Sequence, residues 1–118
     1  MAQHVTIYHN PRCSKSRETL ALLRQHGIEP DVVHYLDTPP DADTLTRLIQ
    51  QLGLSSARDL MRKKDALYPQ LNLSEPSLTE AELIQAMADN PGLIERPVVV
   101  VGQQARIGRP PEQVLEIL

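Results

Sequence analysis

The 118-residue sequence has one cysteine, Cys13, only three tyrosines, and no phenylalanine or tryptophan. A lone cysteine cannot form an internal disulfide, and a free thiol stays reduced in the cytosol, so we expect a cytoplasmic protein. So few aromatic side chains argue against a stacking platform for single-stranded nucleic acid. The formal charge of −3 argues against binding to a phosphate backbone. We therefore expect no nucleic acid among the partners.

Long apolar runs are also missing. No stretch approaches the roughly 18–20 residues of a membrane span, and the N-terminal segment has neither the basic start nor the apolar core of a signal peptide. One cysteine and four scattered histidines form no metal-binding pattern. The sequence thus predicts no membrane partner and no bound metal. Its length predicts one domain with a core of its own.

What is present alternates between β-favouring runs and helical patterns. The strands that we expect lie within residues 5–8, 31–35, 97–101 and 105–107. The helices that we expect cover residues 14–26, most of 38–95, and 110–118. Within the long helical segment, Gly53 predicts one helix end, and Thr79 and Glu82 form a capping box that predicts a helix start.

The order of these elements predicts an α/β fold. The first strand–helix–strand unit should pair its strands in parallel, with a right-handed crossover. The last two strands are joined by a turn short enough for an antiparallel hairpin. A four-stranded mixed sheet flanked by helices is the simplest packing of these units.

Cys13 falls between the first strand and the first helix, a position that favours a reactive thiolate. Unpaired N–H groups and the positive end of the helix dipole should stabilise the negative charge there. The alternative is a small buried hydrophobe, but the residues around Cys13 are loop and surface types. Ser16 completes a C-x-x-S sequence, so no second thiol is available. A tyrosine-phosphatase loop needs arginine six residues after its cysteine, and Thr19 stands there.

Three arginines are candidates for binding an oxyanion. Arg96 and Arg109 each directly precede a proline, and Arg62 follows a short helical segment. Guanidinium groups stay charged and bind tetrahedral oxyanions through two hydrogen bonds. Each arginine alone is more often a solvated surface residue. The spacing does not show whether the three converge.

Two nearby residues leave alternatives open. His9 could support the thiolate as a charged imidazolium, or it could simply hydrogen-bond the turn. Pro97 stands at the start of a strand, where proline costs no ladder hydrogen bond, and its peptide bond could be cis or trans.

Three blocks of sequence resemble the ArsC family of thioredoxin-fold arsenate reductases, and most closely its YfgD-like branch. They are Ile-Tyr-His-Asn-Pro-Arg-Cys-Ser-Lys-Ser-Arg at 7–17, Glu-Arg-Pro-Val-Val-Val at 95–100, and Arg-Ile-Gly-Arg-Pro-Pro-Glu at 106–112. Residues 34–36 and 60–64 and Tyr68 also fit the family. The resemblance runs from Val5 to Leu118, with the three blocks in the family's order.

The resemblance implies a single domain, residues 1–118, with a thioredoxin-like four-stranded mixed sheet and a helical insertion at about 38–95. It implies Cys13 as the nucleophile and Arg62, Arg96 and Arg109 as the arginines that hold the oxyanion. The supporting residues that it implies are His9, Ser16 and Pro97, with Pro97 at the place of the fold's cis proline.

The resemblance also implies an activity, the reduction of arsenate to arsenite through one cysteine in arsenic detoxification. No cofactor would be bound; glutathione would be a co-substrate. The partners would be arsenate or a similar oxyanion, glutathione and a glutaredoxin. Ser16 departs from the C-x-x-C switch of related regulators. The alternatives are a general glutathione-dependent thiol reductase and a non-enzymatic thioredoxin-fold binding or regulatory module.

Overall fold

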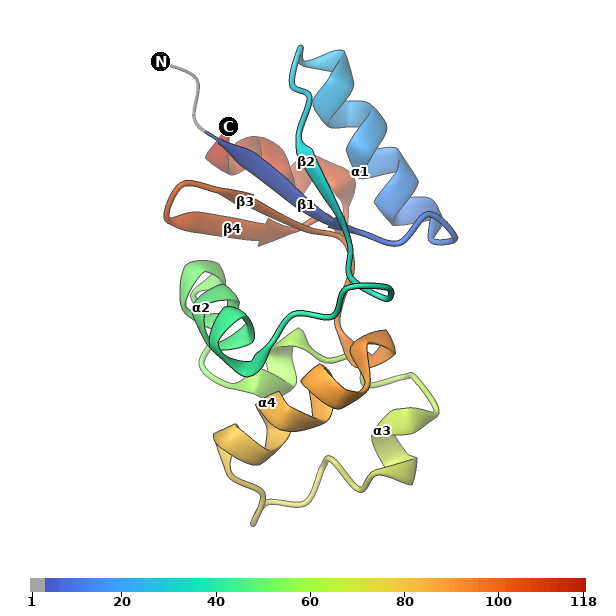
Figure 1. Cartoon of the computed structure of the whole chain (residues 1–118), viewed down its shortest axis with the longest axis vertical. Helices are drawn as coiled ribbons and strands as arrows, with labels where there is room; N and C mark the ends of the chain where they lie inside the picture. Colours follow the sequence, from blue (N-terminus) through green and yellow to red (C-terminus); the bar gives the residue numbers. More distant parts are fainter. Residues whose placement is uncertain (1–3) are drawn as a thin grey trace. The chain divides into compact units, whose positions relative to one another are not determined.

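The computed structural model describes residues 4–118. Residues 1–3 belong to the N-terminal segment in which we expected no signal peptide, and they lie outside the described residues. The chain divides into two compact units (Figure 1). One unit combines residues 1–38 with 96–118, and the other is residues 39–95. The first unit holds the whole sheet, and the second is helical.

The sheet has four strands in the order β2-β1-β3-β4. The strands are β1 (Val5–His9), β2 (Asp31–His34), β3 (Val98–Val101) and β4 (Gln104–Ile107). β1 pairs with β2 in parallel, whereas β1–β3 and β3–β4 are antiparallel. The expected mixed sheet, with its parallel first unit and final hairpin, is therefore confirmed.

Helix α1 (Ser14–Gln25) and the 3-10 helix η3 (Pro111–Ile117) supply the core on one face of the sheet. Apolar side chains of β1 and β3 pack there against those of the two helices: Val5, Ile7, Leu23, Val99, Val101, Val114 and Ile117. The helix that we expected at the C-terminus is present, and it is a 3-10 helix. Pro111, Val114 and Ile117 are buried and spaced three apart, and three residues per turn aligns them on one side of a 3-10 helix.

The helical unit begins and ends its helices where capping residues allow. Its elements are α2 (Ala42–Leu52), η1 (Ala57–Leu60), α3 (Leu67–Gln70), α4 (Glu80–Asp89) and η2 (Pro91–Leu93). Gly53 ends α2 in the left-handed region, with φ 71°. The expected capping box is present at the start of α4, where Thr79 and Glu82 bond each other's backbone N–H groups.

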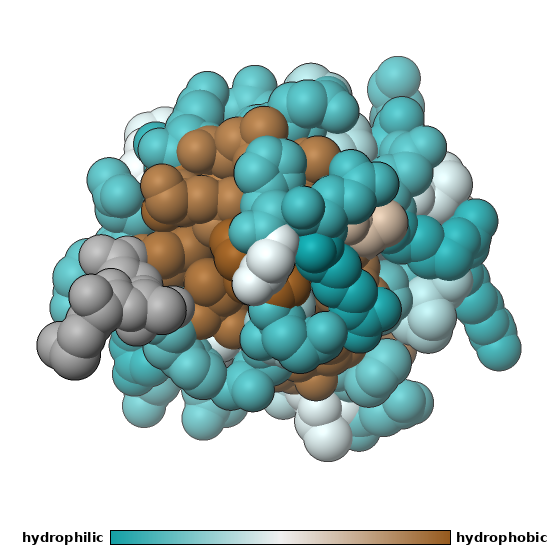
Figure 2. Space-filling model, turned by 90° about the horizontal axis from the view of Figure 1, so that it is seen from above, coloured by the Kyte–Doolittle hydropathy of each residue, from teal (hydrophilic) through white to brown (hydrophobic). Residues whose placement is uncertain are grey.

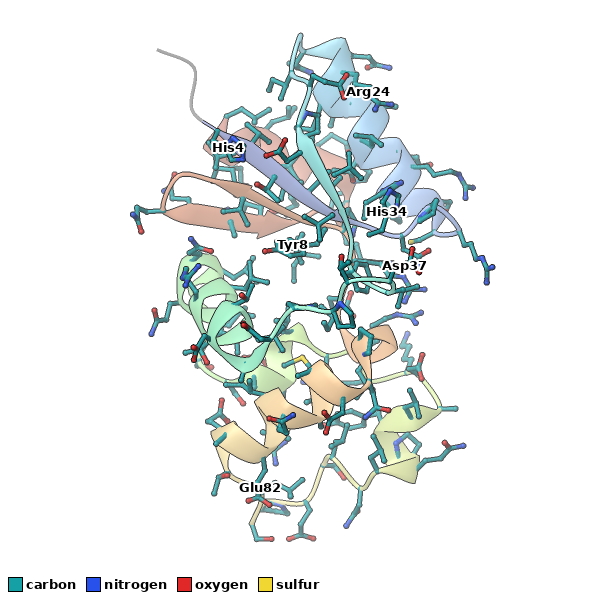
Figure 3. All side chains as sticks on the ribbon, viewed as in Figure 1. His4, Tyr8, Arg24, His34, Asp37 and Glu82 are labelled. Carbon is teal, nitrogen blue, oxygen red and sulfur yellow. The ribbon has the colours of Figure 1, made fainter. Side chains whose placement is uncertain are left out.

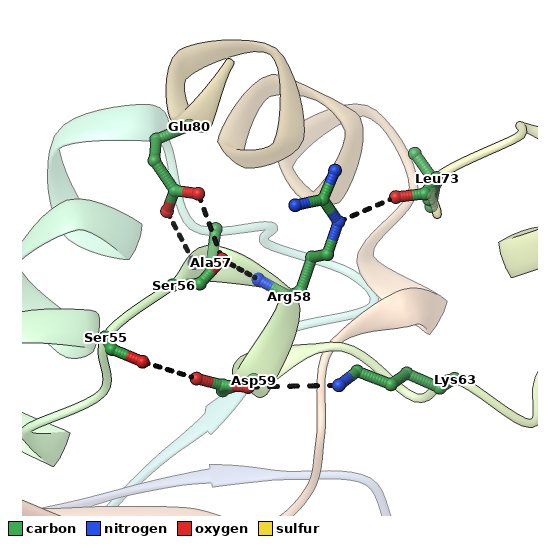
Figure 4. A network of polar contacts seen from close by, with 8 residues as sticks. All are labelled: Ser55, Ser56, Ala57, Arg58, Asp59, Lys63, Leu73 and Glu80. Carbon is green, nitrogen blue, oxygen red and sulfur yellow. Dashed lines mark hydrogen bonds and ion pairs between the residues drawn. The ribbon is translucent and has the colours of Figure 1, made fainter. Parts of the chain in front are cut away.

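A polar network joins η1 to the start of α4 (Figure 4). The Glu80 carboxylate accepts the Ala57 N–H at 2.6 Å and the Ser56 hydroxyl at 2.9 Å. Arg58 Nε donates to the Leu73 carbonyl at 2.9 Å. Charge-assisted hydrogen bonds of this kind are stronger than neutral ones, so the network fixes the segment that leads to Arg62.

Candidate active site

Cys13 lies at the junction between β1 and α1. After β1 ends at His9, the Cys13 N–H donates to the Asn10 carbonyl and the Arg12 N–H to the Asn10 side-chain oxygen, both at 3.0 Å. Cys13 is the N-cap residue of α1, and its side chain is half-buried. The sulfur therefore lies at the positive end of the helix dipole, beside N–H groups that have no partner within the helix.

The pKa of the Cys13 thiol lies below its ordinary value. Burial is the largest effect and raises the pKa. It is outweighed by the backbone N–H of Ser16, the guanidinium of Arg96 and the backbone N–H of Lys15, which lower it. Neither N–H forms a capping hydrogen bond of ordinary geometry with the sulfur. The surroundings still favour the thiolate, which is the nucleophilic form.

Arg109 makes a direct side-chain contact with the nucleophile. Its Nη2 lies 3.4 Å from Cys13 Sγ, and its Nε donates to the Arg96 carbonyl at 2.7 Å. Arg109 is exposed, so water screens its charge, and the half-buried Arg96 has the larger effect on the pKa of the thiol. The structure thus brings two of the three candidate arginines to Cys13.

Both of these arginines precede a cis proline, at Arg96–Pro97 and Arg109–Pro110. The alternative left open for Pro97 is therefore resolved as cis. The Gly108 N–H donates to the Pro97 carbonyl at 2.9 Å, so a backbone hydrogen bond joins the loop before β3 to the loop after β4. The two arginines are carried on loops that hold each other in place.

His9 and Ser16 form a buried pair behind the nucleophile. His9 Nδ1 lies 2.6 Å from Ser16 Oγ, which also accepts the Asn10 N–H at 3.0 Å. His9 is 5% exposed and Ser16 is fully buried. Burial, followed by the charges of His34 and two arginines, lowers the pKa of His9. Of the two alternatives for His9, the structure favours a neutral imidazole that hydrogen-bonds the turn.

Arg62 belongs to the helical unit. Its backbone N–H donates to the Leu93 carbonyl at 2.7 Å, next to an isolated β-bridge between Met61 and Ile94. Its Nη1 forms an ion pair with Asp65 at 3.0 Å. The role of Arg62 toward an oxyanion remains a prediction.

One residue near the nucleophile, Tyr35, carried no expectation of its own as a site residue. Tyr35 follows β2 and is 1% exposed; burial raises the pKa of its hydroxyl, and the Arg96 charge and the Asn10 side chain lower it to a smaller extent. Tyr35 belongs to the 34–36 segment that fits the ArsC family, but nothing in its spacing indicates a site. Burial of a tyrosine becomes visible only once the sheet is assembled.

The end of the sheet where β1 begins carries an apolar patch with polar residues around it (Figure 2). A hollow of about 640 Å³ lies where β1 begins, and its apolar lining is Val5, Ile28, Val101, Ile117 and Leu118. Figure 3 labels His4 at this end, and His34 at the end where β1 leads to Cys13. Cys13, with Arg109 and the His9–Ser16 pair, lies at the end of the sheet that follows β1.

Within residues 4–118, no three histidine, cysteine, aspartate or glutamate side chains are grouped so that they could hold a metal ion. In the same part of the chain, no helix is long and apolar enough to cross a membrane.

A cysteine at the start of α1, with a cis proline at the start of β3, defines a thioredoxin-like α/β protein with a thiol site. A model of the ArsC family matches residues 8–117, and the chain belongs to this family. It is 64% identical to the uncharacterized protein YfgD of Escherichia coli over 100% of this chain and 99% of that one. It is 52% identical to arsenate reductase of Haemophilus influenzae, covering 97% and 98% of the two chains. The solved structure of arsenate reductase from Vibrio cholerae matches over 100% of both chains, with 59% identity and a TM-score of 0.98.

Proposed function

We propose that this protein is an arsenate reductase that uses Cys13 as its nucleophile and takes its electrons from glutathione and a glutaredoxin. One observation carries the proposal: Arg109 Nη2 lies 3.4 Å from the Cys13 sulfur, at the start of a helix. Relatives named arsenate reductase, at 50–52% identity over 97% of this chain, support the substrate.

The arginines would bind the oxyanion beside the sulfur. Arg96 and Arg109 offer guanidinium hydrogens on the side of Cys13, and their positive charge would offset the charge of the arsenate oxygens as the thiolate approaches. Arg62 would join them as the family resemblance implies. Its pairing with Asp65 means that an incoming anion would compete with a carboxylate for this guanidinium.

The reaction balances with two thiols as reductants. The Cys13 thiolate attacks arsenic(V), an S–As bond forms, and one arsenate oxygen leaves as water. A glutathione thiolate then attacks the Cys13 sulfur and forms an S–S bond. The electron pair of the S–As bond passes to arsenic, which leaves as arsenite. A glutaredoxin thiol finally takes the glutathione from the mixed disulfide, and the Cys13 thiolate is restored.

The lone cysteine supports an external reductant, because Cys13 has no second thiol in the chain. Ser16 stands where a resolving cysteine would stand, and its hydroxyl is fully buried and hydrogen-bonded to the turn. A hydroxyl cannot exchange with a disulfide. Glutathione chemistry belongs to a reducing compartment, so we also propose that the protein works in the cytoplasm.

The deciding experiment is a steady-state assay with arsenate, glutathione and glutaredoxin. Cys13→Ser should abolish turnover. Arg96→Lys and Arg109→Lys should lower kcat/KM by at least about tenfold, because an ammonium cannot reproduce the planar fork. The matched control is Arg106→Lys, which changes an arginine of β4 that pairs with Glu116 at 2.9 Å. Turnover that survives all of these substitutions would contradict the proposal.

A second experiment tests the coupling to glutathione by intact-mass spectrometry. Treatment with oxidised glutathione should add one glutathione to the wild type and none to Cys13→Ser. If the wild type resists this adduct while its thiol is still alkylated readily, the glutathione-coupled function is wrong. In that case the binding-module alternative becomes the better one.

A further inference from the structure

Two buried polar atoms in the candidate site have no hydrogen-bond partner. Among residues 4–118, the buried side-chain nitrogen and oxygen atoms without a hydrogen-bond partner are the Tyr35 hydroxyl and Arg96 Nε. Leaving such a group unpaired costs about 1–3 kcal/mol, and buried polar groups in folded proteins are rarely left so. Two unpaired groups in one site suggest a missing common partner.

The surroundings of Tyr35 show which kind of partner is missing. The Asn10 and Arg96 side chains lower the pKa of Tyr35, as donors directed at its oxygen do, so neither accepts the hydrogen of the hydroxyl. Arg96 has donors and no acceptor. Burial, with the Cys13 charge as a smaller contribution, raises the pKa of Tyr35, so its hydroxyl keeps its hydrogen. Both unpaired atoms are therefore donors that need an acceptor.

We propose that the Tyr35 hydroxyl is an oxyanion-binding group, and that it donates, together with Arg96 Nε, to an oxygen of the tetrahedral anion bound beside Cys13. The inference rests on the proposed function only in taking arsenate as that anion. Tyr35 adds a neutral donor inside the site, where Arg96 supplies the positive charge. The bound anion would then accept a hydrogen bond from each of the two unpaired donors. Its binding would be stronger than the positive charge of Arg96 alone would make it.

The test measures binding without turnover. In a Cys13→Ser background, arsenate and sulfate are titrated by isothermal calorimetry with and without Tyr35→Phe. A hydrogen bond to a charged group should make the loss at least about tenfold in Kd for both anions. The matched control is Tyr8→Phe, which removes the hydroxyl of a half-buried tyrosine in β1 and should change Kd by less than about twofold.

Stability separates a binding role from a structural one. Because the Tyr35 hydroxyl is unpaired, Tyr35→Phe without anion should unfold at the same urea concentration as the parent protein or a higher one. Added sulfate should then stabilise the parent more than the variant. Weaker binding together with lower stability in the absence of anion would instead indicate a structural role and would overturn the inference.

The outcomes also distinguish this inference from the proposed function. If the protein turns over no arsenate but Tyr35→Phe still weakens sulfate binding, the proposed function is wrong and the inference stands for another oxyanion. If arsenate is turned over but Tyr35→Phe binds both anions as tightly as its parent, the inference is wrong, and ordered water serves the two donors. A Cys13→Ser protein that binds neither anion also overturns it.

Discussion

Replacing Gly108 with alanine would force a methyl group into space that two side chains already fill. A Cβ atom there would lie 2.5 Å from Thr19 Oγ1, 2.8 Å from Pro97 Cγ and 3.1 Å from Thr19 Cγ2. Carbon atoms pack best at about 3.5–4.0 Å, so something must move. The Gly108 N–H is held by the Pro97 carbonyl at 2.9 Å, and the Thr19 hydroxyl by the Lys15 carbonyl at 2.8 Å. Neither the Gly108 backbone nor the Thr19 hydroxyl can therefore shift away without weakening a hydrogen bond.

The magnitude follows from two opposing contributions. Overpacking of a filled site costs about 1–3 kcal/mol. Alanine also restricts the unfolded chain, which contributes about 0.4–1 kcal/mol in the other direction. Since both neighbours are held by hydrogen bonds, we expect a net loss of about 2 kcal/mol in the free energy of unfolding. For a chain of this length, that lowers Tm by on the order of 6–12 °C.

Urea unfolding followed by far-UV circular dichroism measures this loss, with an unchanged m-value. Gly92→Ala is the matched control, because nothing lies within 4 Å of its added Cβ. Its stability should stay within about 0.5 kcal/mol of the wild type. Adding Thr19→Ala to Gly108→Ala should cost less than Thr19→Ala does alone, because the closest atoms are then gone. A Gly108→Ala protein as stable as Gly92→Ala would refute the packing argument.

Two further predictions concern titration. The alkylation rate of Cys13 should reach half its maximum below pH of about 8.5, the value for an unperturbed thiol, and Arg96→Gln should move this midpoint upward. A midpoint at or above 8.5 in the wild type would contradict the argument. Because burial lowers the pKa of His9 below the unfolded value of about 6.5, the unfolded state binds more protons as pH falls through that value. The wild type should therefore lose more stability than His9→Gln between pH 7 and pH 5; equal losses in urea unfolding would show that His9 is not the group responsible.

Local signals were sufficient for the elements whose ends depend on a few neighbouring residues. The capping box of Thr79 and Glu82 begins α4, and the left-handed Gly53 ends α2, where the sequence predicts, because these interactions span only a few residues. The four β-favouring runs became the four strands for a similar reason. Two of the three pairings were expected, the parallel β1–β2 pair from the strand–helix–strand unit and the β3–β4 hairpin from its short turn.

Elements that depend on tertiary packing were not predictable in the same way. The short helix α3 has no capping side chain and no buried residue, so its sequence carries no periodic signal. The sequence of the final segment predicts a helix, but its 3-10 form is seen only in the structure, where Pro111, Val114 and Ile117 are buried at three-residue spacing. The neutral state of His9 depends on its burial against Ser16, seven positions along the chain.

The convergence of Arg96 and Arg109 on Cys13 follows from strand direction, although spacing in the sequence does not reveal it. Arg96 stands just before β3 and Arg109 just after β4, and an antiparallel pair brings the start of one strand to the end of the other. β1 is antiparallel to β3, with Tyr8 opposite Val98, so the segment after β1 reaches that same end. The β3–β4 hairpin by itself brings Arg96 and Arg109 to the same end of the sheet. The sequence carried no signal for the β1–β3 pairing. This pairing places the Cys13 thiol beside Arg96 and Arg109. A change of register at β1–β3 would therefore move Cys13 away from the two arginines and abolish the site, although the amino-acid sequence would be unchanged.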